Sequence, residues 1–280
     1  MLAHVGSAPY RAGVDQRPTT VAGLLDDLAA EHRDLDGMVA TLDEDGWGRA
    51  TPAVGWAVRD QLSHLAYFDD AAVLAINDPS AFAALVESAL AGADPMQTHL
   101  RRGRAQTGGE LLAWWRGSRL ALVEATGSLP EGARVPWFGP PMGVLSFASA
   151  RLMETWAHGQ DIADALGVVR TPTARLRHVA HLGVRTRGFS YAVRGLEPPP
   201  TPVRVAVTGP ADEDWVWGDG GVTHDSIEGP ALDFCLVVTQ RRNVADTGLR
   251  VEGDAARQWM SIAQAFAGPP GTGRPSGHRP

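Results

Sequence analysis

The first two thirds of the chain place apolar residues at intervals of three and four, the spacing that one face of a helix requires. Thr19 or Thr20 can cap the first such helix, whose aliphatic face consists of Val21, Leu24, Leu25, Leu28, Leu35 and Val39. The same spacing predicts further helices at about 57–77, 81–91, 110–128, 146–166 and 174–193. Turn-rich segments separate several of them, so the pattern predicts an antiparallel helical bundle.

The pattern changes at residues 197–200, which read Glu-Pro-Pro-Pro and predict a linker. Beyond it, alternating or short apolar segments predict strands at 202–208, 214–217, 222–227 and 249–251, and helices at 230–240 and 255–266. We therefore expect an α+β protein, with a helical metal-binding bundle over 19–197 and a smaller α+β domain over 201–267. Residues 1–18 are expected to form a flexible N-terminal extension, and the Gly/Pro-rich residues 268–280 a disordered tail.

The charge balance argues against polyanionic partners. Acidic residues outnumber basic ones by 32 to 25, which gives a formal net charge of −7. A protein of that sign does not favour nucleic acid or an anionic membrane surface. Every basic residue is an arginine, and together with 32 glycines and 20 prolines this usage is typical of GC-rich genomes such as those of actinobacteria.

Nothing in the sequence indicates export or membrane insertion. The N-terminal segment lacks the apolar stretch of a signal peptide, and no run reaches the ~18–20 apolar residues that a membrane-spanning helix needs. Cys235 is the single cysteine, so no internal disulfide forms, and its apolar neighbours predict an inert core thiol. These features predict a soluble, cytoplasmic protein.

Glu154 and His158 are the strongest candidates for chemistry. They lie four residues apart in a predicted helix, which places them on one face about 6 Å apart along the axis. A carboxylate and an imidazole so placed can bind one divalent metal ion, or can form an ordinary surface pair. Most flanking residues are apolar, and a glutamate in such a helix is costly unless it is paired or binds a cation.

His64, on another predicted helix, is a third candidate ligand, although a lone histidine is more often a core residue. Two histidines and one glutamate without a fourth ligand are typical of a catalytic zinc site with an open position. Asp60, four residues before His64, and Asp161, three residues after His158, are placed to accept the second ring N–H of each histidine. Asp60 fits equally well as a first-turn carboxylate that offsets the helix dipole.

Two segments carry a family resemblance. Residues 56–65 read Trp-x-Val-Arg-Asp-x-x-x-His-Leu, and residues 154–167 read Glu-x-Trp-x-His-Gly-x-Asp-Ile-x-Asp-Ala-Leu-Gly. Together they resemble the DinB-like superfamily of metal-binding four-helix bundles, and in particular the branch of mycothiol-dependent maleylpyruvate isomerase. That branch also has a C-terminal α+β domain similar to sterol-carrier domains, so the resemblance covers about 20–270. It implies that His64, Glu154 and His158 are the metal ligands.

The resemblance also implies cofactors and a reaction type. Zn²⁺, or another divalent metal, would bind a low-molecular-weight thiol such as mycothiol as a nucleophile toward a small electrophilic substrate. An isomerase would add this thiol to an activated double bond, whereas an S-transferase would use it to displace a leaving group. In the family an arginine of the second domain takes part in catalysis, and Arg241 matches it best. The alternative is a cation that stabilises a helix C-terminus.

We expect the second domain to pack over the metal end of the bundle, with Arg241 reaching a shared cleft to bind an anionic substrate group. Two other functions stay open. One is a metal enzyme of lyase, hydrolase or cyclase type that uses no thiol. The other is a non-catalytic protein that binds a metal and an apolar ligand. The lack of a fourth ligand favours catalysis, because structural zinc normally has four protein ligands.

Overall fold

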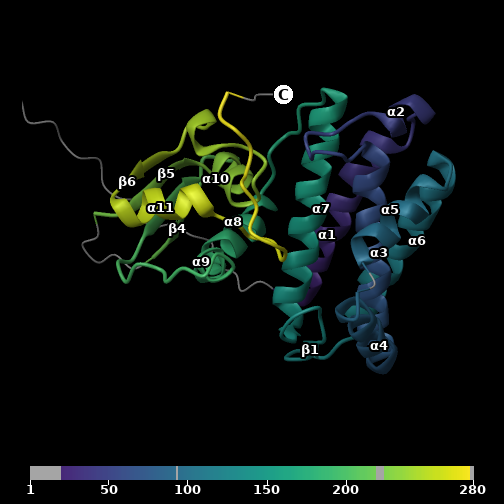
Figure 1. Ribbon diagram of the computed structural model, residues 1–280. Coiled ribbons are helices and arrows are strands. Elements are labelled where there is room, and N and C mark those ends of the chain that lie inside the picture. Colours follow the sequence, from purple (N-terminus) through teal and green to yellow (C-terminus); the bar gives the residue numbers. More distant parts are fainter. Residues whose placement is uncertain (1–19, 93, 219–223, 278–280) are drawn as a thin grey trace, which may run out of the picture.

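The computed structural model describes residues 20–92, 94–218 and 224–277, and shows a helical bundle beside a smaller α+β unit (Figure 1). The helices bury the apolar faces that the spacing predicted; Leu24, Leu35, Leu62 and Leu65, for example, are completely inaccessible to solvent. The bundle consists of α1 (Val21–Val39), α3 (Val58–Asn77), α6 (Gly108–Gly127) and α7 (Val144–Leu166). The predicted α+β fold class is confirmed.

Side-chain contacts define the directions of the bundle helices. The pairs α1–α6 and α3–α7 are antiparallel, as shown by Asp36 with Arg116, His32 with Arg119, Gln61 with His158 and Asp69 with Arg151. By contrast, α3 and α6 run parallel. Arg59 near the start of α3 contacts Gln106 just before α6, and Asp70 further along α3 bonds to Ser118 of α6. The bundle therefore has an up-down-down-up order, and the prediction of an antiparallel bundle is wrong for the α3–α6 pair.

A parallel pair of helices needs a crossover, which α4 (Pro79–Leu90) and α5 (Pro95–Arg104) supply. Because Gly103 has no side chain, α5 packs closely against α3: a Cβ at Gly103 would lie 2.4 Å from the Cβ of Ser63. Asp94 caps α5 by accepting from the backbone N–H of Met96. The short helix α2 (Glu44–Gly48) packs against α3 at its N-terminal side.

The segment between α6 and α7 forms a small hairpin within the loop that the sequence predicts. Strand β1 (Arg134–Val135) pairs antiparallel with β2 (Met142–Gly143), and residues 136–141 connect them. Helix α7 then runs to Gly167, whose φ of 69° is the left-handed conformation that favours glycine at a helix C-terminus.

The second unit is a four-stranded sheet covered by helices. Its strands are β3 (Arg204–Thr208), β4 (Asp214–Trp217), β5 (Ser226–Pro230) and β6 (Arg250–Glu252), in the order β4-β3-β5-β6. The β3–β5 pair is parallel and the other two pairs are antiparallel. Its helical elements are α8 (Leu176–Arg185), α9 (Arg187–Ala192), α10 (Ala231–Val238), η1 (Val244–Asp246) and α11 (Asp254–Ile262).

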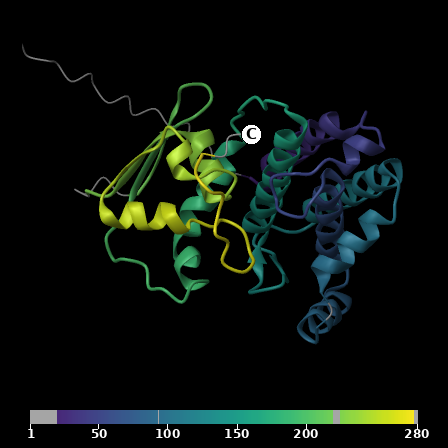
Figure 2. The same cartoon turned by 45° about the horizontal axis from the view of Figure 1, so that its top comes forward.

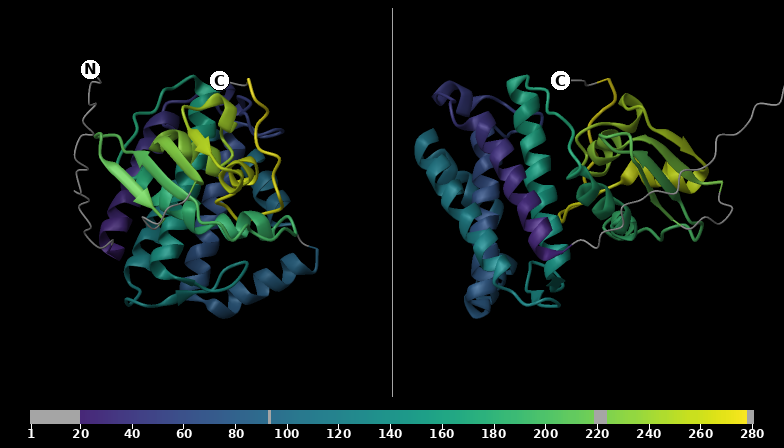
Figure 3. Two further views of the ribbon diagram at one scale, coloured as in Figure 1. Left: turned by 90° about the vertical axis from the view of Figure 1, so that its left-hand side faces the viewer. Right: turned by 180° about the vertical axis from the view of Figure 1, so that it is seen from behind.

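The two faces of this sheet differ in polarity. Val205, Val207 and Ile227 are buried in the same apolar cluster as residues of α10 and α11. On the other face Glu228 forms ion pairs with Arg204 and Arg250. Helix α11 packs against β6 and α9. Figure 2 shows the second unit beside the bundle, and Figure 3 (left) looks onto the sheet with the bundle behind it.

The boundary between the two units lies earlier than the sequence predicted. Helix α8 packs against α10 and β4 as well as α7, and α9 packs against α11. The bundle proper therefore ends with α7, at Leu166, rather than at residue 197. The prediction failed because α8 has a helical pattern like that of the bundle helices, and the pattern does not reveal which neighbour a helix covers. Of the bundle helices, α7 lies nearest to the second unit (Figures 1 and 3).

The prediction of a disordered tail is wrong for residues 268–277. Arg194 donates to the carbonyl of Gly271, Asn243 donates to the carbonyl of Arg274, and Asp246 accepts from the N–H of Gly277. These contacts hold the segment against the second unit in spite of its glycine and proline content. The predicted extension, 1–18, lies outside the described residues. In the described ranges, no helix has the length and apolarity to cross a membrane.

Candidate metal centre

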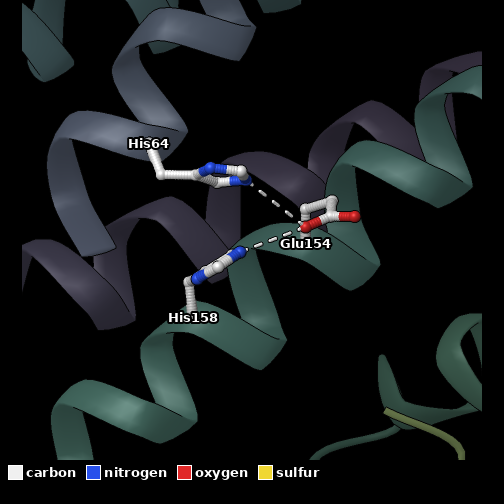
Figure 4. A group of neighbouring side chains, drawn as sticks. All are labelled: His64, Glu154 and His158. Atoms are coloured by element: carbon white, nitrogen blue, oxygen red, sulfur yellow. Dashed lines mark ion pairs between the residues drawn. The ribbon is translucent and has the colours of Figure 1, made fainter. Parts of the chain in front are cut away.

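Three side chains from two antiparallel helices meet inside the bundle: His64 from α3, and Glu154 and His158 from α7 (Figure 4). Oε2 of Glu154 lies 3.2 Å from Nε2 of His158 and 3.9 Å from Nε2 of His64. One potential ligand atom of each residue lies within 4.8 Å of the other two. The structure thus brings together the three residues that the sequence predicted as ligands.

The hydrogen bonds around these residues direct lone pairs toward one point. Nδ1 of His158 lies 2.5 Å from Oε1 of Gln61, which only accepts, so Nδ1 carries the proton and Nε2 presents a lone pair to Glu154. Nδ1 of His64 lies 3.4 Å from Nε2 of His99, which leaves Nε2 of His64 facing the same carboxylate. Acceptors so placed repel one another unless a proton or a metal ion lies between them.

Two imidazoles and a carboxylate are a ligand set that suits zinc. Two atoms bound to one zinc ion lie at most about 4.2 Å apart, and both distances to Oε2 of Glu154 are shorter than this. The Glu154 side chain keeps 20 % of its surface exposed, whereas those of His64 and His158 keep 12 % and 11 %. Within the described residues the cluster contains no fourth His, Cys, Asp or Glu, so a zinc ion held by these three residues would have room for a further ligand.

Burial and charge keep the cluster in the protonation state that binds a metal. Burial, followed by the neighbouring His158, lowers the pKa of His64 to about 4. Burial alone would raise the pKa of Glu154, but its interactions with His158 and His64 outweigh that effect and lower the pKa well below the usual value. A neutral imidazole and an ionised carboxylate are the forms that coordinate zinc.

Gln61, rather than Asp161, orients His158. Nε2 of Gln61 donates to Oγ1 of Thr51 at 2.9 Å, which fixes the amide so that its oxygen faces the imidazole. The prediction that Asp161 holds His158 is wrong, because Asp161 lies almost a full turn further along α7 and accepts from Arg241 and Arg274 instead.

Asp60 likewise does not hold His64. Its two oxygens accept from Arg104 at 2.9 and 3.0 Å, and one of them also accepts from the N–H of Ala57 at the start of α3. Of the two roles predicted for Asp60, a partner for His64 or a carboxylate in the first turn of α3, the structure shows the second. Asp60 lies one turn before His64, where its oxygens accept from the backbone N–H of Ala57 and from the guanidinium of Arg104 in place of His64. The Nδ1 of His64 faces His99 instead.

The arginine predicted to bind substrate is engaged elsewhere. Arg241 donates to Asp161 at 2.9 Å, and its side chain is only 13 % exposed. Arg274 bridges Asp161 and Asp164, and Arg242 also pairs with Asp164. We call these five residues the arginine network. Arg241 does lie close to the metal end of α7, but it joins the second unit to the bundle and does not offer the unpaired guanidinium that the sequence-based prediction required.

Comparison with known proteins shows which proteins this chain resembles. Residues 28–163 match the family described as mycothiol maleylpyruvate isomerase N-terminal domain. Two uncharacterised proteins of Mycobacterium tuberculosis, Rv0036c of strain H37Rv and MT0041 of strain CDC 1551, are each 46 % identical to this chain over 252 residues. The match covers 89 % of this chain and 96 % of each relative. The chain therefore belongs to one family with these mycobacterial proteins and carries the mycothiol maleylpyruvate isomerase N-terminal domain over residues 28–163.

Solved structures show that the family fold extends into the second unit. The crystal structure of mycothiol-dependent maleylpyruvate isomerase is similar with a TM-score of 0.56, at 15 % sequence identity, over 83 % of this chain and 93 % of that one. A His→Ala mutant of that isomerase is similar with a TM-score of 0.54. At this level of identity the likeness concerns the fold, which includes both the bundle and the α+β unit.

Two residues beside the centre, His99 and Gln61, were not predicted from the sequence as parts of the site. His99 is buried on α5, with Nδ1 at 3.4 Å from Oγ of Ser63 and Nε2 at 3.4 Å from Nδ1 of His64. No helix was predicted over 95–104, although Asp94 followed by proline is a helix start signal. Gln61 stands three residues before His64, hence on the same face of α3, and that spacing was the available signal.

Proposed function

We propose that this protein is a zinc-dependent enzyme that uses a low-molecular-weight thiol, mycothiol, as an isomerase or S-transferase acting on a small electrophile. The observation that carries the proposal is the His64–Glu154–His158 cluster, which has three converging ligand atoms, partial exposure and no fourth ligand within the described residues. The match to the mycothiol maleylpyruvate isomerase N-terminal domain supports the thiol, because the structurally similar isomerase is mycothiol-dependent.

The residues of the chain provide the binding and orientation. A divalent cation held here would lower the pKa of a coordinated thiol and so favour the nucleophilic thiolate. Glu154 supplies the negative charge, and Gln61 keeps the Nε2 lone pair of His158 directed at the centre. Nδ1 of His64 in turn faces His99. Contacts of this kind around metal ligands fix the tautomer and the ring orientation.

Zinc-loaded protein, mycothiol and a panel of electrophiles that includes maleylpyruvate provide the test. We expect consumption of an electrophile above the non-enzymatic rate, with a requirement for both zinc and mycothiol. Glu154→Gln should abolish this activity, and the matched change Glu87→Gln on the exposed surface of α4 should not. Turnover with zinc but without any thiol would instead support a thiol-independent metal enzyme. Zinc uptake without turnover would support a binding protein.

A further inference from the structure

We propose that the electrophile bound beside the metal centre is an uncharged aromatic or similarly planar molecule, rather than a carboxylate. This inference rests on the proposed function, because it concerns the substrate of that same site. Two independent observations carry it: aromatic rings border the ligands on the α3 side, and both arginines of the two ligand-bearing helices are engaged by carboxylates.

Two aromatic side chains, Phe68 and Trp56, lie directly beside the histidines of the centre; with Trp137 and Phe138 we call them the aromatic surface. Phe68, one turn after His64 on α3, lies 4.6 Å from the His64 ring, measured between centroids. Trp56, just before α3, lies 5.5 Å from His64 and 6.0 Å from His158, and is nearly parallel to the latter with an interplanar angle of 15°. Flat apolar faces therefore border the centre on the α3 side.

The surface continues onto the loop between β1 and β2. Phe138 lies 5.6 Å from Phe68, and Trp137 lies 6.4 Å from it. The neighbouring Phe82 and Phe147 are completely buried and belong to the core, but Trp56, Phe68, Trp137 and Phe138 each remain half-buried. Aromatic side chains that keep exposed surface next to a partly exposed metal centre are placed to contact a ligand.

The arginines of α3 and α7 are already paired with carboxylates, and Arg134 of β1 donates to the carbonyl of Pro141. Helices α3 and α7 carry one arginine each, and both bond to carboxylates: Arg59 to Glu44 and Arg151 to Asp69. Two arginines from α5 and the second unit are also paired, Arg104 with Asp60 and Arg241 with Asp161. Arg101 of α5 is exposed and follows His99 by two residues, which places it on the opposite side of that helix.

The charge of the complete site leads to the same conclusion. Two positive charges of a divalent cation bound here would be balanced by the Glu154 carboxylate and by one thiolate. A substrate carboxylate would then add a negative charge to an already balanced set, and the arginines of α3 and α7, which are paired, would not compensate it. A neutral ring would lose little solvation and would gain stacking contacts with Phe68, Trp56 and Phe138.

A pair of probes that share a reactive ring and differ by one carboxylate group tests the inference. Chlorodinitrobenzene is neutral, and chlorodinitrobenzoate carries a carboxylate on the same kind of ring. With either probe the thiolate sulfur forms a bond to the ring carbon, the carbon–chlorine bond breaks, and chloride leaves with the electron pair. The thiol proton passes to the buffer. To correct for the different reactivity of the two probes, each rate with zinc-loaded protein and mycothiol is divided by the rate of the same probe with mycothiol alone. The quotient is the normalised rate.

We expect the normalised kcat/KM for the neutral probe to exceed that for the anionic probe by at least about tenfold. Phe68→Leu should lower the rate with the neutral probe roughly two- to tenfold, whereas Phe189→Leu, on the surface of α9, should change neither rate. Phe138→Arg should raise the relative rate with the anionic probe several-fold. Equal rates with the two probes, or no effect of Phe68→Leu in a folded, zinc-loaded variant, would overturn the inference.

A binding measurement separates this inference from the proposed function. Quenching of tryptophan fluorescence reports the affinity of the zinc-loaded protein for unreactive dinitrotoluene and dinitrobenzoate. If dinitrotoluene binds at least about tenfold more tightly but no probe reacts with mycothiol, the ligand class stands and the thiol chemistry fails. If chlorodinitrobenzoate reacts with mycothiol as fast as chlorodinitrobenzene, the thiol chemistry stands and the ligand class is wrong.

Discussion

Helix α7 carries two polar clusters less than one turn apart, and they differ in how their charges are balanced. In the arginine network, Asp161 and Asp164 are bonded to Arg241, Arg242 and Arg274, so each carboxylate is matched within the protein. In the His64–Glu154–His158 cluster, one carboxylate faces two imidazoles; Gln61 accepts from Nδ1 of His158 and so leaves its Nε2 lone pair free, and Nδ1 of His64 faces His99. This cluster lacks a cation of its own.

The difference between the two clusters distinguishes buried carboxylates that stabilise the fold from a buried carboxylate that is available to bind a ligand. A buried carboxylate that is bonded to guanidinium groups has all the partners it needs, and its removal affects folding and domain contact. A buried carboxylate that faces only acceptors requires something from outside the chain. The incomplete cluster is therefore the one expected to bind a ligand, and substitutions in the two clusters should have opposite consequences.

The largest expected effect is the loss of the metal in Glu154→Gln. Replacing the carboxylate by an amide removes the only anionic ligand, so zinc affinity should fall by more than about a hundredfold, beyond the range typical of outer contacts. The metal-free variant should remain folded, because the bundle is held by its apolar packing. Metal analysis and circular dichroism on the same samples measure both quantities. Parallel loss of helicity would show a structural zinc instead.

The next largest effect is expected for the buried pair of Arg151 and Asp69. Arg151→Met should lower the free energy of unfolding by about 3–5 kcal/mol, because it leaves an unpaired carboxylate in the core. Even with Arg151 present, burial raises the pKa of Asp69 to about 6. Urea denaturation measures the loss, and the double variant Arg151→Met/Asp69→Leu should recover a large part of it. A fully additive double variant would contradict the pairing.

Asp161→Asn is the counterpart of Glu154→Gln: the same chemical change, seven residues further along α7. We expect zinc content at the wild-type level and a loss of about 1–3 kcal/mol in unfolding free energy, because Arg241 and Arg274 lose a partner at a partly buried contact. Thermal denaturation and metal analysis check this pair of results. Loss of zinc here, with unchanged stability, would reverse our assignment of the two clusters.

A smaller effect on the metal centre is expected from Gln61→Leu. The change leaves all three ligands in place but removes the acceptor for Nδ1–H of His158, so zinc affinity should fall about 10–100-fold. Competition with a chelating indicator gives the affinity. Gln106→Leu, at another partly buried glutamine outside the centre, serves as the control. An unchanged affinity in Gln61→Leu would show that the amide does not orient the ring.

A pH-dependent effect is expected for His32, a buried histidine whose Nε2 has no hydrogen-bond partner among the described residues. Burial, together with Arg119 and Arg151, lowers its pKa from 6.5 to about 3. Because the unfolded chain then binds a proton that the folded protein does not, stability is present above pH 6.5 and is lost as the pH falls below it, by roughly 1.4 kcal/mol per pH unit. The test compares Glu154→Gln with the double variant Glu154→Gln/His32→Gln. The urea midpoint of unfolding, plotted against pH, should change less steeply in the double variant. An identical slope would exclude His32 as the source.

The sequence predicted features that depend on helical spacing and could not predict those that depend on contacts between distant segments. Glu154 and His158 follow from the i,i+4 rule, and His64 follows from its place in a second amphipathic helix. The partners predicted for the two histidines, Asp60 and Asp161, were chosen by the same local rule and were wrong. Their carboxylates bond to Arg104 of α5 and to Arg241 and Arg274, which approach only after tertiary packing.

The up-down-down-up order has a consequence for the way the site assembles during folding. Gln61 and His158 are 97 residues apart in sequence, and the segment between them includes the crossover through α4 and α5 as well as α6, which also packs against α3. Contacts of such long sequence separation form slowly, because the chain must close a large loop first. Zinc affinity should consequently appear late in refolding, after most of the helical signal. A zinc indicator added during a refolding jump would then time the docking of the last helix.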